Sequence, residues 1–247
     1  MRGDREPESL TALWTKMAAV VLVVGQLSWF TGLLLRTLAV SSAGFTSDEV
    51  ARFAAEPFAA REQLAAYTAN PTLTVAGYAT FFAGAILLIP ATAGLAWLVA
   101  RRSPALAAFG GALAILGLVA RVYFAGVDHV AFQLADSQGL DAAATMVLDT
   151  YVDISYGPWR IAVVAAFGQY LGALLLAIGL YRARIFGVVR TLMFLWPATM
   201  WTGVLKSAGW WDVIASLVLL VVLGILAVQW YRTGEPRLGR DRSLRIW

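Results

Sequence analysis

The sequence contains no cysteine and only one histidine, His129. These absences exclude disulfide frameworks, thiol redox chemistry and the Cys/His ligand sets of zinc and iron–sulfur sites. The motifs HExxH, GxSxG and GxxxxGK[ST] are also missing, which disfavours metalloproteases, serine hydrolases and NTPases. Aspartate-rich DDxxD motifs do not occur, which disfavours membrane prenyltransferases of that type. We therefore expect no metal and no cofactor.

Charged residues are few as well. They make up 14% of the 247 residues, whereas about 25% is usual in soluble domains, and hydrophobic residues make up 60%. The chain is too apolar for a soluble domain or a disordered segment. Asn70 is the only asparagine, and Lys16 and Lys206 are the only lysines among 19 basic residues. This arginine-rich composition is typical of GC-rich bacterial genomes and predicts a protein of the bacterial plasma membrane.

Apolar runs of transmembrane length occur six times. A helix needs roughly 20 apolar residues to cross a hydrocarbon core about 30 Å thick. The pattern predicts an all-α, polytopic membrane helix bundle with six transmembrane helices in a single domain. The predicted spans are residues 17–40, 74–100, 105–127, 159–181, 185–204 and 211–231.

The connections between these spans differ in charge. Thirteen of the 19 basic residues flank one end of the spans, whereas the long connections at the other end are acidic. By the positive-inside rule, both termini are cytoplasmic. Residues 232–247 form a basic tail that we expect to contact anionic lipids rather than nucleic acid. The sequence leaves the oligomeric state open.

Two outer connections are expected to contain helices, at residues 46–69 and 141–156. Thr46 and Glu49 have the spacing of a capping box, and Pro57 divides the first segment. These amphipathic segments could lie on the membrane or across the mouth of the bundle.

Small residues and amides within the spans predict how the helices pack. Gly168 and Gly172 form a GxxxG pair, which allows close approach to another helix of this chain or of a second copy. Gln26 and Gln169 lie in the middle of spans and need partners inside the bundle, so interhelical hydrogen bonds are their expected role.

Polar residues at membrane depth are the main candidates for a site. Arg121 lies in the third predicted span, and Asp128 follows on the same helical face. Because a charge inside the bilayer is costly, Arg121 must face protein or water. Either it belongs to a structural ion pair or it contacts a ligand in an outward-facing polar cup. The candidate ligand-binding residues are Arg121, Arg36, Arg160 and Lys206, all near the same level.

Candidate catalytic residues come from the same region. His129 is the one side chain that titrates near neutral pH without perturbation. Asp149 and Asp153 are four residues apart on a predicted helix, where they could support acid–base chemistry, hold a hard cation or form an ordinary solvated surface. The candidate catalytic residues are Asp128, His129, Asp149 and Asp153.

Two classes of function remain open. The favoured one is a non-catalytic accessory or sensory membrane module that binds a small or lipidic ligand in the polar cup. The alternative is a membrane-embedded enzyme acting on a hydrophobic small molecule, such as an isoprenoid (terpene) cyclase with Asp128 as proton donor. Aromatic side chains would stabilise a carbocation in that enzyme. The candidates are Trp29, Tyr123, Phe124, Trp196 and Trp201.

Three short stretches carry a resemblance to a family. They are Asn70–Pro71, Arg121–Val122–Tyr123, and Gly172–Ala173–Leu174 with the following stretch 180–184. Across roughly residues 70–200 the chain resembles uncharacterised bacterial six-helix membrane proteins of the DUF4386 kind. The long segment 41–69 and the basic tail depart from that pattern. The resemblance implies a six-helix membrane fold, and it assigns no activity and no site residues.

Overall fold

The computed structural model of the protein describes residues 6–56, 58–157, 160–198 and 203–233. Within these ranges the chain forms nine helices and no strand, which confirms the predicted all-α class. Their bounds are α1 Glu6–Ser41, α2 Ser47–Ala55, α3 Ala60–Ala69, α4 Pro71–Ala100, α5 Pro104–Gln138, α6 Leu140–Tyr156, α7 Arg160–Arg182, α8 Val188–Ala198 and α9 Trp210–Thr233.

Five of these helices are long and apolar enough to cross a membrane, namely α1, α4, α5, α7 and α9. The shortest, α7, has 23 residues and at a rise of 1.5 Å per residue is about 34 Å long. Most exposed large side chains on these helices are apolar, as expected of surfaces that face lipid. The described part of the chain is therefore compatible with a transmembrane helix bundle.

The fifth predicted span, residues 185–204, differs from the structure. Only α8 forms within it, and its 11 residues are about 16 Å long, too short to cross the bilayer. Ile185, Phe186 and Gly187 instead belong to the turn after α7, and Pro197 falls in the last turn of α8. Residues 199–202 of this predicted span lie outside the described residues.

Helix α5 extends beyond its prediction. The predicted span ended at residue 127, whereas the helix continues to Gln138 and stops at Gly139, whose φ is +89°. Asp128 and His129 therefore belong to this long helix and not to a connection. The extension carries the polar residues of α5 toward α3 and α6.

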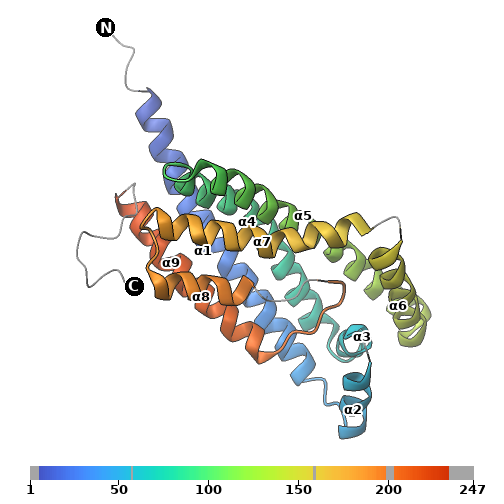
Figure 1. Cartoon of the computed structure of the whole chain (residues 1–247). Helices are drawn as coiled ribbons and strands as arrows, with labels where there is room; N and C mark the ends of the chain where they lie inside the picture. Colours follow the sequence, from blue (N-terminus) through green and yellow to red (C-terminus); the bar gives the residue numbers. More distant parts are fainter. Residues whose placement is uncertain (1–5, 57, 158–159, 199–202, 234–247) are drawn as a thin grey trace.

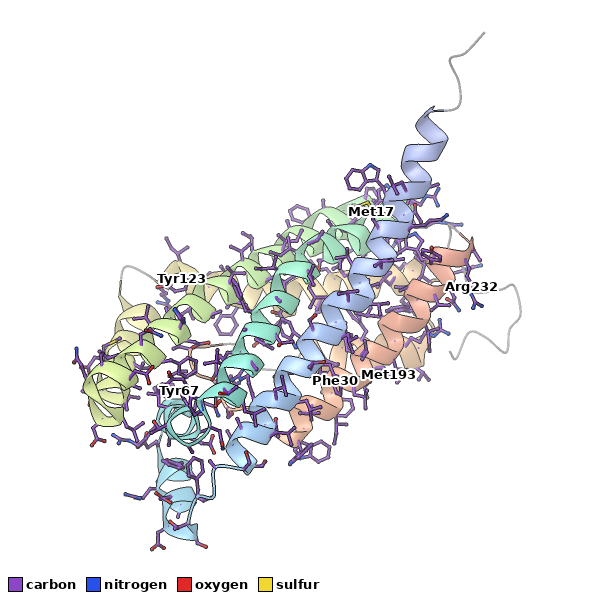
Figure 2. All side chains as sticks on the ribbon, turned by 180° about the vertical axis from the view of Figure 1, so that it is seen from behind. Met17, Phe30, Tyr67, Tyr123, Met193 and Arg232 are labelled. Atoms are coloured by element: carbon purple, nitrogen blue, oxygen red, sulfur yellow. The ribbon has the colours of Figure 1, made fainter. Side chains whose placement is uncertain are left out.

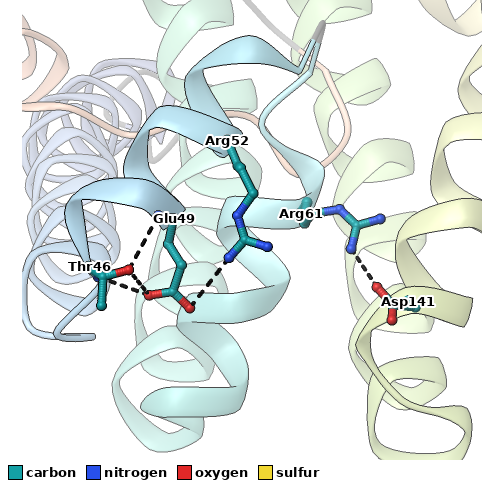
Figure 3. A network of polar contacts seen from close by, with 5 residues as sticks. All are labelled: Thr46, Glu49, Arg52, Arg61 and Asp141. Carbon is teal, nitrogen blue, oxygen red and sulfur yellow. Dashed lines mark hydrogen bonds and ion pairs between the residues drawn. The ribbon is translucent and has the colours of Figure 1, made fainter.

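The predicted capping box is confirmed at the start of α2. The Glu49 amide donates to the Thr46 hydroxyl (3.3 Å), and the Thr46 amide donates to the Glu49 carboxylate (2.8 Å), as Figure 3 shows. The first outer segment is divided between Ala55 and Ala60, around Pro57, as the sequence predicts. Pro57 itself lies outside the described residues. The second outer segment, predicted at 141–156, is α6.

The long helices run side by side, with α1 packed mainly against α4 and α9, and α5 against α4 and α7 (Figure 1). The beginning of α1 and the end of α9 lie at one end of the bundle, which we call the terminal end. Helices α2, α3 and α6 gather at the opposite end, which we call the α3–α6 end. Figure 2 shows Met17 and Arg232 near the terminal end and Tyr67 near the other.

Glycines bring α5 and α7 into close contact. A Cβ atom at Gly172 would lie 2.3 Å from the Ala114 amide nitrogen, and one at Gly117 would lie 2.4 Å from the Cβ of Gln169. The GxxxG pair therefore packs against another helix of the same chain. This close packing places Gln169 of α7 beside the polar residues of α5.

Candidate functional site

A small polar cavity lies toward the α3–α6 end, between α1, α4, α5 and the segment 203–209 that leads into α9. Its volume is about 40 Å³, enough for a few water molecules or a small ion. We call it the cation cavity because three basic side chains line it. Its charged lining residues are Arg36, Arg121, Lys206, Asp128 and Asp212.

Arg36 reaches the cation cavity from α1 and is 5% exposed. Its Nη2 donates to the Tyr78 hydroxyl (3.1 Å) and to the Lys206 backbone carbonyl. Its guanidinium carbon lies 4.1 Å from the centre of the Tyr78 ring and 5.3 Å from that of Phe81. The Nε–H of Arg36 is buried and has no hydrogen-bond partner in the described part of the chain.

Arg121 reaches the same cavity from α5 and is 8% exposed. Its Nε donates to Oε1 of Gln169 on α7 (2.7 Å), which confirms an interhelical hydrogen bond for this amide. Its guanidinium carbon lies 4.4 Å from the centre of the Trp29 ring and 5.7 Å from that of Phe81. Its Nη2 is buried and finds no hydrogen-bond partner among the residues described.

Neither guanidinium forms an ion pair with a residue that the structure describes. Within the described ranges, the pairs with N···O of 4.0 Å or less join Arg52 to Glu49 and Arg61 to Glu56 and Asp141. Asp128 is buried near Arg121, but its Oδ1 accepts from the Leu205 amide (2.6 Å). Asp128 therefore holds the segment 203–209 against α5. Arg121 and Asp128 form no direct ion pair with each other, as their seven-residue spacing along the helix predicts.

Lys206 and Asp212 complete the charged lining on the α9 side. Burial lowers the pKa of the half-buried Lys206 to about 8; Asp212 opposes this change, while Arg121 and Arg36 add to it. The Asp212 carboxylate accepts from the Gly209 amide (3.1 Å) and so caps the start of α9. With three basic and two acidic side chains, the cation cavity has a formal charge of +1 when all five are ionised.

A hydrogen-bonded chain links the cation cavity to α3. Tyr78 accepts from Arg36 and donates to Oε1 of Gln63 (3.0 Å), a fully buried residue of α3. Helix α3 therefore contacts, through Gln63, the ring that holds one of the two guanidinium groups.

Two further contacts hold α3 against its neighbours. The Tyr67 hydroxyl donates to the Asp136 carboxylate of α5 (2.5 Å), and this bond, together with burial, raises the pKa of Tyr67 to about 12. Arg61 bridges Glu56 (2.8 Å) and Asp141 of α6 (2.5 Å), as Figure 3 shows for the second pair. Helices α3 and α6 thus pack against the long helices, whereas α2 has no buried residue.

The other predicted site residues lie elsewhere. Arg160 is exposed at the start of α7 and does not line the cavity. His129 is exposed, because it is rotated about 100° around α5 from buried Asp128. Asp149 is exposed on α6, and the side chain of Asp153 lies outside the described part. In the ranges that the structure describes, no three acidic or histidine side chains cluster closely enough to hold a metal ion.

The sequence pattern indicated Asp212 beside the basic residues but did not indicate Tyr78, Phe81 or the backbone amide that Asp128 binds. Tyr78 and Phe81 share one face of α4, and the Leu205 amide comes from the segment after α8. The three-residue spacing of the two rings shows that they lie together, but only the packing of α1 against α4 places them over Arg36. The available signal was an arginine in each of two apolar helices, which requires such partners.

Comparison with protein-family models, with curated proteins and with solved structures gave no match to this chain. The resemblance to DUF4386 proteins therefore stays a prediction. Function has to be inferred from the geometry and chemistry of the cation cavity.

Proposed function

We propose that the protein is a non-catalytic membrane module whose cation cavity binds a small anion or the anionic group of a larger ligand. The observation that carries this proposal is the pair Arg36 and Arg121. Both side chains are more than nine-tenths buried, both face one cavity, and each keeps an N–H without a partner in the described ranges. A buried charge without a counter-charge is costly, so a bound anion would stabilise this arrangement.

The chemistry of the lining suits an anion. A guanidinium group matches carboxylate and phosphate oxygens with two parallel N–H donors, and its charge strengthens each hydrogen bond. The rings of Trp29, Tyr78 and Phe81 hold the two guanidinium groups in fixed positions through cation–π contacts. The site is therefore largely formed before a ligand arrives.

The alternative, an isoprenoid cyclase, receives less support. A carbocation would lie beside three basic side chains, and about 40 Å³ is too small for an isoprenoid substrate. Trp29 and Phe124 line the cation cavity, but Tyr123 and Trp196 are exposed and Trp201 lies outside the described residues. We therefore favour binding over catalysis.

The proposed location is the bacterial plasma membrane, with six spans, both termini in the cytoplasm and the cation cavity in the outer half. The basic bias of the sequence supports this orientation, and an even number of spans requires the fifth predicted span, residues 185–204, whose described part forms α8, to cross as well. Reporter fusions after Arg102 and Arg184 are expected to report the cytoplasm, and fusions after Glu62 and Asp141 the outside. A reversed report at any two of these sites would contradict the topology.

Anion binding is expected to weaken as the pH rises from 7 to 9. The lowered pKa of Lys206, about 8, means that this side chain loses its positive charge in that range. The charged groups around it are Arg36 of α1, Arg121 and Asp128 of α5, and Asp212 of α9. Because a half-buried charge contributes up to about 1 kcal/mol, the affinity for sulfate, whose own charge does not change over this range, should fall about two- to fivefold.

The measurement is a titration of purified protein with sulfate at pH 7, 8 and 9. Sulfate stays a dianion over this range, whereas phosphate and arsenate themselves lose a proton and gain negative charge. In Lys206→Gln the sulfate affinity should be lower at pH 7 and flat to pH 9. An equally flat profile in the wild type would show that Lys206 does not face the anion.

A further inference from the structure

A second cavity lies in the centre of the bundle, next to the cation cavity. Its volume is about 100 Å³, and α1, α4, α5, α7, α8 and α9 all contribute to its wall. The polar residues of the wall are Gln26, Thr92 and Gln169, and the others are apolar or aromatic. An apolar cavity of about 150 Å³ in another protein accepts benzene, so this central cavity has room for a small apolar group.

Two residues connect the central cavity to the cation cavity. Trp29 lines both of them, and the guanidinium of Arg121 lies over its ring at 4.4 Å. Gln169 lines the central cavity, and its Oε1 accepts from Nε of Arg121 at 2.7 Å. Trp29 and Gln169 thus both line the central cavity and contact Arg121 of the proposed anion site.

Gln26 makes the central cavity chemically different from the cation cavity beside it. Its Nε2 donates to the hydroxyl and carbonyl oxygens of Ser216 (both 3.2 Å), and its Oε1 is buried without a partner in the described part. A carbonyl oxygen repels an anion and accepts from a donor. An anionic group is therefore favoured at Arg36 and Arg121, and disfavoured in the central cavity.

We infer that the ligand is an amphipathic organic anion whose carboxylate or phosphate lies between Arg36 and Arg121 and whose short apolar group enters the central cavity past Trp29. The inference rests on the proposed function, because it needs the cation cavity to hold the anion. At about two thirds of the volume that accepts benzene, the central cavity suits an apolar group of about four carbons.

The test measures the affinities of soluble ligands by titration calorimetry, with the protein in nanodiscs of zwitterionic lipid and empty nanodiscs as the blank. The ligands are methyl phosphate, hexyl phosphate, acetate, hexanoate and hexanol. Each buried methylene should improve affinity roughly fourfold. We expect hexyl phosphate to bind at least about tenfold more tightly than methyl phosphate, hexanoate to exceed acetate similarly, and hexanol to bind far more weakly than either. The phosphate and carboxylate series distinguish the two head groups.

A pair of variants on α9 locates the apolar group. Leu219 lines the central cavity, whereas Val221 is 48% exposed on the same helix. Leu219→Phe should reduce the hexyl-to-methyl phosphate affinity ratio to below about threefold, and Val221→Phe should leave the ratio as in the wild type. Ala173→Leu, which fills the same cavity from α7, is the second variant if Leu219→Phe does not fold.

The possible failures are distinguishable. Equal affinity for methyl and hexyl phosphate would overturn the amphipathic ligand and leave the anion site standing. An unchanged affinity ratio in Leu219→Phe and Ala173→Leu would also overturn it, because the apolar group would then lie elsewhere. If none of the anions binds, the proposed function itself is wrong.

Discussion

Replacing Arg121 with glutamine is expected to remove anion binding while leaving the ligand-free protein as stable as the wild type, or more stable by about 1–4 kcal/mol. Arg121 is buried, has no ion pair and keeps an N–H without a partner in the described ranges. Removing its charge therefore relieves a burial penalty and breaks no ion pair. The affinity for phosphate should fall at least about 100-fold, as expected when one member of a buried charge pair is lost.

One unfolding experiment, carried out with and without phosphate, measures both the stability of the ligand-free protein and its stabilisation by the anion. At a concentration of about 100 times the Kd, the wild type gains about 2.7 kcal/mol, and Arg121→Gln should gain almost nothing. Arg160→Gln, at an exposed arginine outside the cavity, is the control and should behave like the wild type. A loss of about 3–5 kcal/mol in ligand-free Arg121→Gln would instead indicate a structural charge.

The substitution Asp128→Asn further distinguishes an anion-binding role of Arg121 from a structural one. Because Asp128 accepts from the Leu205 amide and forms no ion pair with Arg121, the two substitutions should have nearly independent effects on stability. The double variant should therefore show the sum of the single effects. Recovery of stability in the double variant would reveal a charge pair that the structure does not contain.

Replacing Gly117 with valine is expected to destabilise the protein by about 3 kcal/mol or more. A Cβ at this position would lie 2.4 Å from the Cβ of Gln169 and 2.6 Å from its backbone nitrogen, so α5 and α7 must separate. The displacement would also move Gln169 away from Arg121, which should weaken anion binding in whatever protein still folds.

The matched control is Gly126 of the same helix, where an added Cβ would meet no atom within 4 Å. Gly126→Ala should be neutral or stabilising by up to about 1 kcal/mol, because alanine favours the helix. Chemical unfolding in mixed micelles compares the variants. Equal effects at the two glycines would show that the close contact between α5 and α7 is not formed.

Much of the fold follows from the sequence because the bilayer imposes one strong rule, an apolar helix of sufficient length. That rule located α1, α4, α5, α7 and α9, and the Thr46–Glu49 pair located the start of α2. It did not give the bounds of α8, because the apolar residues 185–187 belong to a turn and not to a helix. Composition alone does not separate an apolar turn from an apolar helix end.

The cation cavity could be predicted only in part. Arg36, Arg121 and Lys206 stand out because a charge in an apolar run demands an explanation, and the structure brings these three together. Arg160 shares their approximate depth but lies outside the cavity, because depth along a helix does not fix the rotation of its faces. The partners of Arg121, Trp29 and Gln169, depend on helix packing that no local pattern encodes.

The central claim is that an anion lies between the guanidinium groups of Arg36 and Arg121. The most direct test is selenium anomalous scattering from crystals soaked in selenate, because selenate resembles phosphate and its selenium marks its position. The protein must contain ordinary methionine, so that selenate is the source of the selenium signal. We expect one strong peak within hydrogen-bond distance of both side chains, and its loss in Arg121→Gln. A cation cavity without selenate at concentrations that occupy other sites, or an equal peak in the variant, would contradict the account.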